Sequence, residues 1–337
     1  MGVRSVFDVA AAAFLSSSFS TRQLQTRILR GATYLPPGIQ SALADFNARV
    51  SGPDGAAAGE GDVRGALTAD ALAQDPPSHR DLVGMVDRQT WALLRQRSSQ
   101  LDNARMLSAA MIGAADWLEA VPLPWHSMSS RDFSTAVRLR LGLPQHATSH
   151  ICPSCRKEFC DILGHHALSC SSDGDRIHRH NAIRDDVRDS CRRAQLNPRR
   201  EPRHLLEESG EKPADVWLPT FDMGREAALD VVCTSPCTDS VYRQAASQQG
   251  FAAAQAEAAK RHKSLEKCEQ AGILFLPVAV EVFGGWGETA LAVIRRIGSL
   301  LAEASGRSRS AETRYLRQRL SLRLQRCNAA MVQARGA

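Results

Sequence analysis

Four cysteines and two adjacent histidines lie within the nineteen residues of CPSCRKEFCDILGHHALSC, positions 152–170. Thiolate sulfur and imidazole nitrogen are ligands that Zn²⁺ prefers, and a tetrahedral site needs four of them. The C-x-x-C pair supplies two ligands, a histidine and the last cysteine supply two more, and Cys160 is wrongly spaced for either half. The predicted ligands are Cys152, Cys155, Cys170 and one of the two histidines, His166 or His165. The zinc would be structural because protein fills all four positions.

A second group of residues combines two carboxylates with two lysines. Asp215 begins a predicted strand, and Asp230 lies in the apolar run AALDVVC. Adjacent antiparallel strands would bring the carboxylates together, and Mg²⁺ between them would offset their repulsion. Lys260 and Lys263 lie one turn apart on the next predicted helix, so either could orient or help deprotonate an attacking water. The alternative interpretation is a turn aspartate and solvated lysines.

A basic helix is predicted over RHNAIRDDVRDSCRRAQL, residues 179–196. Ile183 and Val187 line its apolar side, and arginines including Arg184 and Arg188 surround the rest. Arginines in this pattern predict contacts to a phosphate backbone that weaken as salt increases. The net charge of +6 at pH 7 is compatible with a polyanionic partner but does not require one.

The elements that must position these residues change in type along the chain. Residues 1–150 have the pattern of an all-helical region, with a loop rich in Gly, Ala and Asp at 51–62. Beyond it, the predicted elements are a helix over 179–196, strands over 202–206, 213–221 and 227–236, a helix over 240–269, a strand over 273–283, and helices over 288–304 and 310–334. This order predicts an α/β sandwich in which a helix crosses between the third and last strands.

Bulk composition favours a reducing, intracellular setting. Nine cysteines are an odd number and, outside 152–170, are scattered along the 337 residues, which argues against a secreted disulfide framework. No apolar run is long enough to span a membrane, so no membrane partner is expected. The Arg- and Ser-rich N-terminus has the composition of a transit peptide, but we interpret it as a pair of amphipathic helices.

Taken in order, the motifs resemble the C-terminal region of certain non-LTR retrotransposon polyproteins. The motifs are CPSC…GHHALSC, RHNAIRDDV, KPADV, LDVV, AE..K..K and PVAVEVFGGWG. The stretches GVRS…AAAAFLSSS…LQTRIL and GAADWLEAVP…F..AVRLRLGLP are similar to the segment between the reverse transcriptase and a zinc knuckle in those proteins. The resemblance covers most of the chain, but not the loop at 51–62. It implies a fragment or remnant that begins just past a polymerase.

The resemblance also implies a fold and a set of site residues. It predicts a restriction-like endonuclease of the PD-(D/E)xK class, with an αβββαβ core, after an all-helical region and a zinc knuckle. Asp215 and Asp230 match the acidic pair, and Lys260 or Lys263 matches the lysine. His166 stands where the resembling proteins usually have the zinc-binding histidine, so the resemblance favours it over His165. The predicted nucleic-acid contacts are Arg179, His180, Arg184 and Arg188. The predicted domains are a helical region at 1–150, the knuckle at 151–171, the nuclease at 172–306 and a basic helix at 307–337.

Some positions depart from the family pattern. Ala214 is inserted between Pro213 and Asp215, Ser264 stands where the family commonly has Tyr, and Glu281 stands where it tends to have Thr.

Three functions compete on these grounds. The first is a Mg²⁺-dependent endonuclease that nicks a DNA target. The second is an inactive nucleic-acid-binding remnant with a structural zinc site, and the third is an intracellular helical interaction protein held by zinc. The expected partner is DNA, with the element's RNA as a second candidate, and the expected location is the nucleus. The oligomeric state stays open.

Overall fold

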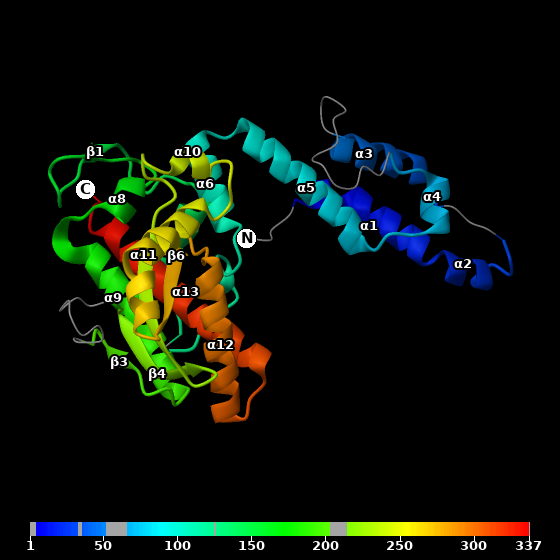
Figure 1. The fold of residues 1–337 in the computed structure, drawn as a ribbon. Helices are drawn as coiled ribbons and strands as arrows, with labels where there is room; N and C mark the ends of the chain where they lie inside the picture. The colour runs from blue at the N-terminus through cyan, green and yellow to red at the C-terminus, as the bar shows by residue number, and fades with distance from the viewer. Residues whose placement is uncertain (1–4, 33–35, 52–65, 125, 203–213, 337) are drawn as a thin grey trace. The chain divides into compact units, whose positions relative to one another are not determined.

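The computed structural model describes residues 5–32, 36–51, 66–124, 126–202 and 214–336 (Figure 1). By their internal contacts they form two compact units, Met1–Ser99 and Gln100–Ala337. The sequence places a boundary after residue 150 instead. The two positions differ because helix α7 (Ser130–Leu141) packs with the second unit, where its Ala136 lies in one apolar cluster with Leu322.

The first unit is helical, as predicted for its described residues. Its helices are α1 (Val6–Ser20), α2 (Arg22–Ile28), α3 (Ile39–Ser51), α4 (Ala69–Gln74) and α5 (His79–Arg97). Leu15, Phe46 and Leu82 bury their side chains in one apolar core. Helix α5 begins where Ser78 and Asp81 cap each other's backbone N–H groups, which is a capping box. Apart from Ser51, the predicted loop at 51–62 lies outside the described residues.

The second unit is built on a four-stranded mixed sheet. Its strands, in spatial order, are β3 (Arg199–Arg200), β4 (Val216–Asp222), β5 (Arg225–Thr234) and β6 (Leu274–Glu281). The first two pairings are antiparallel and the β5–β6 pairing is parallel. Helix α11 (Phe251–Gln270) crosses between the parallel strands, which confirms the predicted crossover. The strand predicted at 202–206 lies outside the described residues, apart from Pro202.

Helices cover both faces of this sheet (Figure 1). The remaining helices of the unit are α6 (Gln100–Ala109), the 3₁₀ turn η1 (Asp116–Leu118), α7, α8 (His165–Ser169), the 3₁₀ turn η2 (Ser172–Gly174), α9 (Asp175–Arg193), α10 (Tyr242–Ala245), α12 (Glu288–Ser305) and α13 (Arg309–Gln333). Leu229 of β5 packs in the core with α9, α12 and α13. Ala228 packs in a separate cluster with Cys268 of α11. Because side chains alternate along a strand, Asp230 shares the α11 face with Ala228.

One predicted helix differs from those observed, and the predicted C-terminal helix belongs to the same core as the sheet. The helix predicted at 240–269 is two helices, α10 and α11, separated at Gly250, whose φ of +77° is in the left-handed region that favours glycine. The C-terminal helix is part of the core, because Leu316, Leu320 and Leu324 of α13 pack in the cluster of the sheet. Among the described residues, no helix is both long and apolar enough to cross a bilayer.

Candidate metal cluster and carboxylate pair

A short hairpin and one helical turn position the cysteines and the histidine. Strands β1 (His150–Ile151) and β2 (Phe159–Cys160) pair antiparallel, and α8 follows them. The Asp161 carboxylate accepts hydrogen bonds from the backbone N–H groups of His165 at 3.1 Å and His166 at 2.8 Å. This contact fixes the start of α8 and therefore the direction of the His166 ring.

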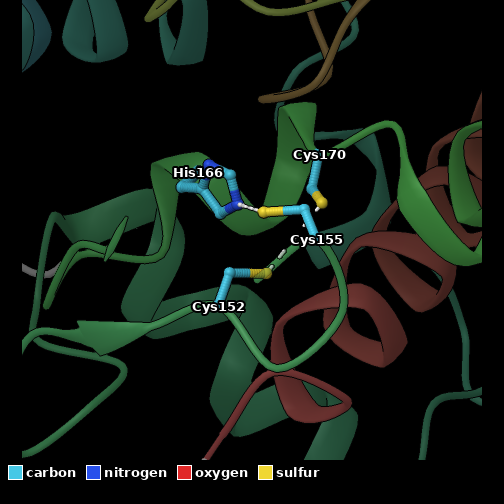
Figure 2. A group of neighbouring side chains, drawn as sticks. All are labelled: Cys152, Cys155, His166 and Cys170. Atoms are coloured by element: carbon cyan, nitrogen blue, oxygen red, sulfur yellow. Dashed lines mark hydrogen bonds between the residues drawn. The ribbon is translucent and has the colours of Figure 1, made fainter. Parts of the chain in front are cut away.

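The four predicted ligands converge on one point (Figure 2). The ligand atoms of Cys152, Cys155, His166 and Cys170 all lie within 4.8 Å of one another. The sulfurs of Cys152 and Cys170 are 4.0 Å apart, and the Cys155 sulfur is 3.5 Å from His166 Nε2. A tetrahedral zinc site has ligand–ligand distances of about 3.3 to 3.8 Å, given its bond lengths. The cluster could therefore bind a metal such as zinc.

The structure places His166 in the cluster and His165 outside it. His165 is buried, and its ring meets Phe283 edge to face, with 6.2 Å between the ring centroids. His166 presents Nε2 to the cysteines, while its Nδ1 lies 3.0 Å from the Glu158 carboxylate. A carboxylate on the second ring nitrogen fixes the tautomer that leaves Nε2 free to ligate. We did not predict Glu158, although its place inside the loop was a signal.

The cluster favours the thiolate form of one cysteine. Burial opposes ionisation of Cys152, but the N–H groups of Cys155 and Ser154 and the His166 side chain lower the pKa of this thiol to about 6. Cys160 lies beside Cys152 and is buried as well. Burial, with Cys152 nearby, raises the pKa of Cys160 to about 12. Cys160 therefore remains a thiol, in agreement with its exclusion from the predicted ligand set.

The two predicted carboxylates lie on neighbouring strands. Val216 faces Leu229 in the antiparallel register, and Asp215 and Asp230 are the residues that flank this pair. Their side chains interact with each other. The Asp215 N–H donates to the Leu229 carbonyl at 3.0 Å. The sheet register therefore brings these two carboxylates together, as the sequence predicted.

Only one of the two candidate lysines reaches this pair. The Lys260 ammonium, on α11, lies 2.9 Å from Asp230 Oδ1. Lys263 is one helical turn farther along and is exposed. The face of α11 that covers β5 therefore selects Lys260.

His180 holds the other carboxylate in place. Its Nε2 is 3.0 Å from Asp215 Oδ2 and 3.0 Å from the Val231 carbonyl oxygen. Both partners are acceptors, so Nε2 carries a proton and donates it. The Val231 N–H also donates to Asp215 Oδ2, at 2.8 Å. The hydrogen bond to Asp215 raises the pKa of His180. The sequence predicted a nucleic-acid contact for His180, and the structure instead places it against a carboxylate.

The pKa values of the two carboxyl groups are shifted in opposite directions. Burial raises the pKa of Asp230 to about 6, although Lys260 acts against this shift and Asp215 adds to it. Burial also disfavours the charge on Asp215, but the bonds from His180 and Val231 outweigh it and lower the pKa of that group. Adjacent carboxyl groups whose pKa values are driven apart are typical of functional sites.

The basic residues predicted to bind nucleic acid divide into two groups. Arg179 and Arg184 are each 2% exposed. Arg179 donates to the Asn328 side chain and the Leu168 carbonyl, and Arg184 donates to the Glu201 carboxylate. This corrects the prediction for these two arginines, because their guanidinium groups bind protein acceptors inside the unit. Arg188 is only half-buried and remains a candidate.

A hollow of about 360 Å³ lies beside the carboxylate pair. Its lining includes Arg176, Ile177, His180, Val232 and Lys260. Arg176, in the first turn of α9, is exposed and had not been singled out from the sequence. Its position one turn before His180 on the same helix was the available signal.

No protein-family model matches the chain, and no curated protein matches it. The function has to be inferred from the geometry of the two sites.

Proposed function

We propose that this protein is a metal-dependent DNA endonuclease with a restriction-like fold, derived from the C-terminal region of a non-LTR retrotransposon polyprotein. The observation that carries the proposal is the convergence of Asp215, Asp230 and Lys260 from three separate elements. The element order α9, β3, β4, β5, α11, β6 supports it, because it is the αβββαβ order of the PD-(D/E)xK class. The proposed location is the nucleus.

The oxygen donors at the carboxylate pair suit Mg²⁺, a hard cation that prefers carboxylates. Asp215 and Asp230 would hold the ion, which when bound would stabilise negative charge developing on the scissile phosphate. Lys260 would orient the attacking water, and its ammonium charge would stabilise the hydroxide that forms when this water loses its proton to solvent. His180 would keep Asp215 turned toward the ion. The pairing with Asp230 places the Lys260 ammonium beside the proposed ion site, 2.9 Å from Asp230 Oδ1.

The DNA strand would lie along the hollow beside the carboxylates. We assign Arg176 and Arg188, two of the basic side chains of α9 with exposed surface, to backbone phosphates. The Cys₃His cluster would bind structural zinc and keep the 150–170 segment folded against the unit. The element's RNA is a second candidate ligand of the same basic surface.

The test is nicking of a supercoiled plasmid by the purified chain, with Mg²⁺ or with EDTA. We expect nicking only with Mg²⁺, and a loss of about a thousandfold in Asp215→Asn, since that change removes a metal ligand. Asp239→Asn is the matched control, because Asp239 is an exposed aspartate in the loop after β5. Nicking that persists in Asp215→Asn would place the activity elsewhere. DNA binding without nicking would identify the chain as an inactive binding remnant.

A further inference from the structure

A second cavity, of about 290 Å³, shares no lining residue with the hollow beside the carboxylate pair. It is formed by α9, α13 and the segment just before α7. Its polar lining consists of His126, Asp186, Tyr315, Arg319, Arg323 and Arg326. Neither the zinc cluster nor the proposed nuclease chemistry uses any of these side chains.

Positive charge exceeds negative charge in this lining. Asp186 is 3% exposed, and its carboxylate accepts from Arg319 at 2.7 Å and from Arg323 at 2.8 Å. The third guanidinium, that of Arg326, donates to the carbonyl of Ser127. Three guanidinium groups therefore face one carboxylate. A guanidinium has five N–H donors, so each of these arginines keeps donors for a further acceptor.

His126 places a buried ring nitrogen in the lining of the cavity. It is 4% exposed, and among the described residues its Nε2 has no hydrogen-bond partner. Its ring packs on Tyr315, with 4.9 Å between the ring centroids. Burial lowers its pKa, and the charges of Arg326 and Arg319 lower it further, so the ring is neutral near pH 7. A buried nitrogen without a partner is rare in folded proteins and calls for an acceptor or a donor from a ligand or a water.

We propose that this cavity binds a phosphate group. Its donors would be the free N–H groups of Arg319, Arg323 and Arg326, together with the Nε2–H of His126. Several forked guanidinium donors around one small space suit the tetrahedral oxygens of phosphate. Asp186 fixes the planes of Arg319 and Arg323, so the donors are held in place before the ligand arrives. Arg319 and Arg323 are partly exposed, which leaves the cavity open to solvent.

The test is a calorimetric titration of the full chain with inorganic phosphate in Mg²⁺-free buffer. Without Mg²⁺ neither cleavage nor a cation at the carboxylate pair contributes, so the result does not depend on the proposed nuclease. We expect Arg326→Gln to weaken phosphate binding about tenfold and His126→Phe to weaken it severalfold, since each removes a donor. Arg309→Gln is the matched control, because Arg309 is an exposed arginine of the same helix outside the cavity.

A variant that is expected to bind phosphate more tightly distinguishes the loss of a donor from simple misfolding. Asp186→Asn removes the one negative charge of the lining and releases donors of Arg319 and Arg323. We expect it to bind phosphate more tightly than the wild type, which a damaged fold would not do. No phosphate binding by the folded wild-type chain would overturn the proposal. Equal losses in Arg326→Gln and Arg309→Gln would also overturn it, because they would show only an effect of net charge.

Oligonucleotides then identify the source of the phosphate. A short single strand with a 5′-phosphate is compared with the same strand ending in a 5′-hydroxyl, each with wild type and Arg326→Gln. Dependence on Arg326 for both strands assigns an internal phosphodiester of nucleic acid. Dependence only for the phosphorylated strand assigns a terminal phosphate, and dependence for neither assigns free phosphate.

Discussion

The Cys₃His cluster and the carboxylate pair are two sets of candidate metal ligands in one unit, and they are built in different ways. The cluster uses sulfur and nitrogen atoms from one segment of nineteen residues, held by a short hairpin and one turn of helix. The carboxylate pair uses oxygen atoms from two strands, with Lys260 and His180 added from two helices. One set is local in the chain and the other is assembled by the sheet.

The difference predicts how each site would depend on a bound metal. The cysteines of the cluster pack against one another, whereas Ala167 and Leu168 of α8 pack in a separate apolar cluster of the unit. A bound ion would therefore provide much of the folding free energy of the loop that carries Cys152 and Cys155. The carboxylates rest on a sheet whose core is complete on both faces, and Lys260 already balances part of their charge. We therefore expect metal removal to unfold the first site and only to inactivate the second.

The largest expected effect is loss of a cluster ligand. Cys155→Ser should remove zinc from the purified protein and lower the unfolding free energy by about 5 kcal/mol, or about 10 °C in melting temperature. Metal analysis and thermal unfolding measure both quantities. Cys160→Ser is the control, and it should keep its zinc because Cys160 lies outside the ligand set. Zinc retained by Cys155→Ser would show that Cys155 is not a required ligand, which would contradict the proposed cluster.

Next in size is the difference between the two lysines. We expect Lys260→Met to slow plasmid nicking about a hundredfold, because it removes the ammonium beside Asp230. Lys263→Met should change the rate less than about threefold. The two variants lose the same charge from the same helix, so each controls for the other. An equal effect would mean that the contact between Lys260 and Asp230 is not the functional one.

The third prediction concerns pH and the metal-free protein. Asp230 has a folded-state pKa of about 6, above the ordinary value of 3.8, so the folded state keeps a proton that the unfolded chain has lost. The contribution of this group to stability therefore falls as pH rises from about 4 to about 6. Asp230→Asn cannot titrate, and relative to wild type it should gain about 2 kcal/mol across this window. Denaturant unfolding in EDTA measures the gain, and a constant difference would contradict it.

The smallest expected effect belongs to His180. We expect His180→Ala to slow nicking about tenfold and to raise the Mg²⁺ concentration needed, because Asp215 loses a donor that fixes its orientation. His180→Gln keeps an N–H donor and should recover part of the loss. If both variants behave like wild type, the Val231 N–H alone is sufficient to position Asp215.

The ligand set of the cluster followed from sequence because it is local. Four ligands in nineteen residues leave few arrangements. The spacing allowed either His165 or His166, and the resemblance favoured His166. The pairing of Asp215 with Asp230 also followed, because two adjacent strands joined by a short turn pair antiparallel. The break at Gly250 was missed because a single glycine within an Ala-rich stretch changes helical periodicity very little.

The arginines of α9 show where sequence reasoning fails. In the sequence, Arg179 and Arg184 cannot be distinguished from Arg188. In the structure, Arg179 and Arg184 are buried against protein acceptors. Burial of an arginine depends on which acceptors approach it, and here these come from Asn328 and Glu201, distant in the chain. No local pattern carries that information.

The sequence by itself determined the chemical types of the ligands, the local cluster geometry and the order of helices and strands. Those features depend on spacing and periodicity, which act over a few residues. Only the tertiary structure decided which lysine meets Asp230, that His180 holds Asp215, and that three arginines surround His126 and Asp186. These contacts join residues far apart in the chain, and they exist because the packed core fixes which face of each helix is turned inward.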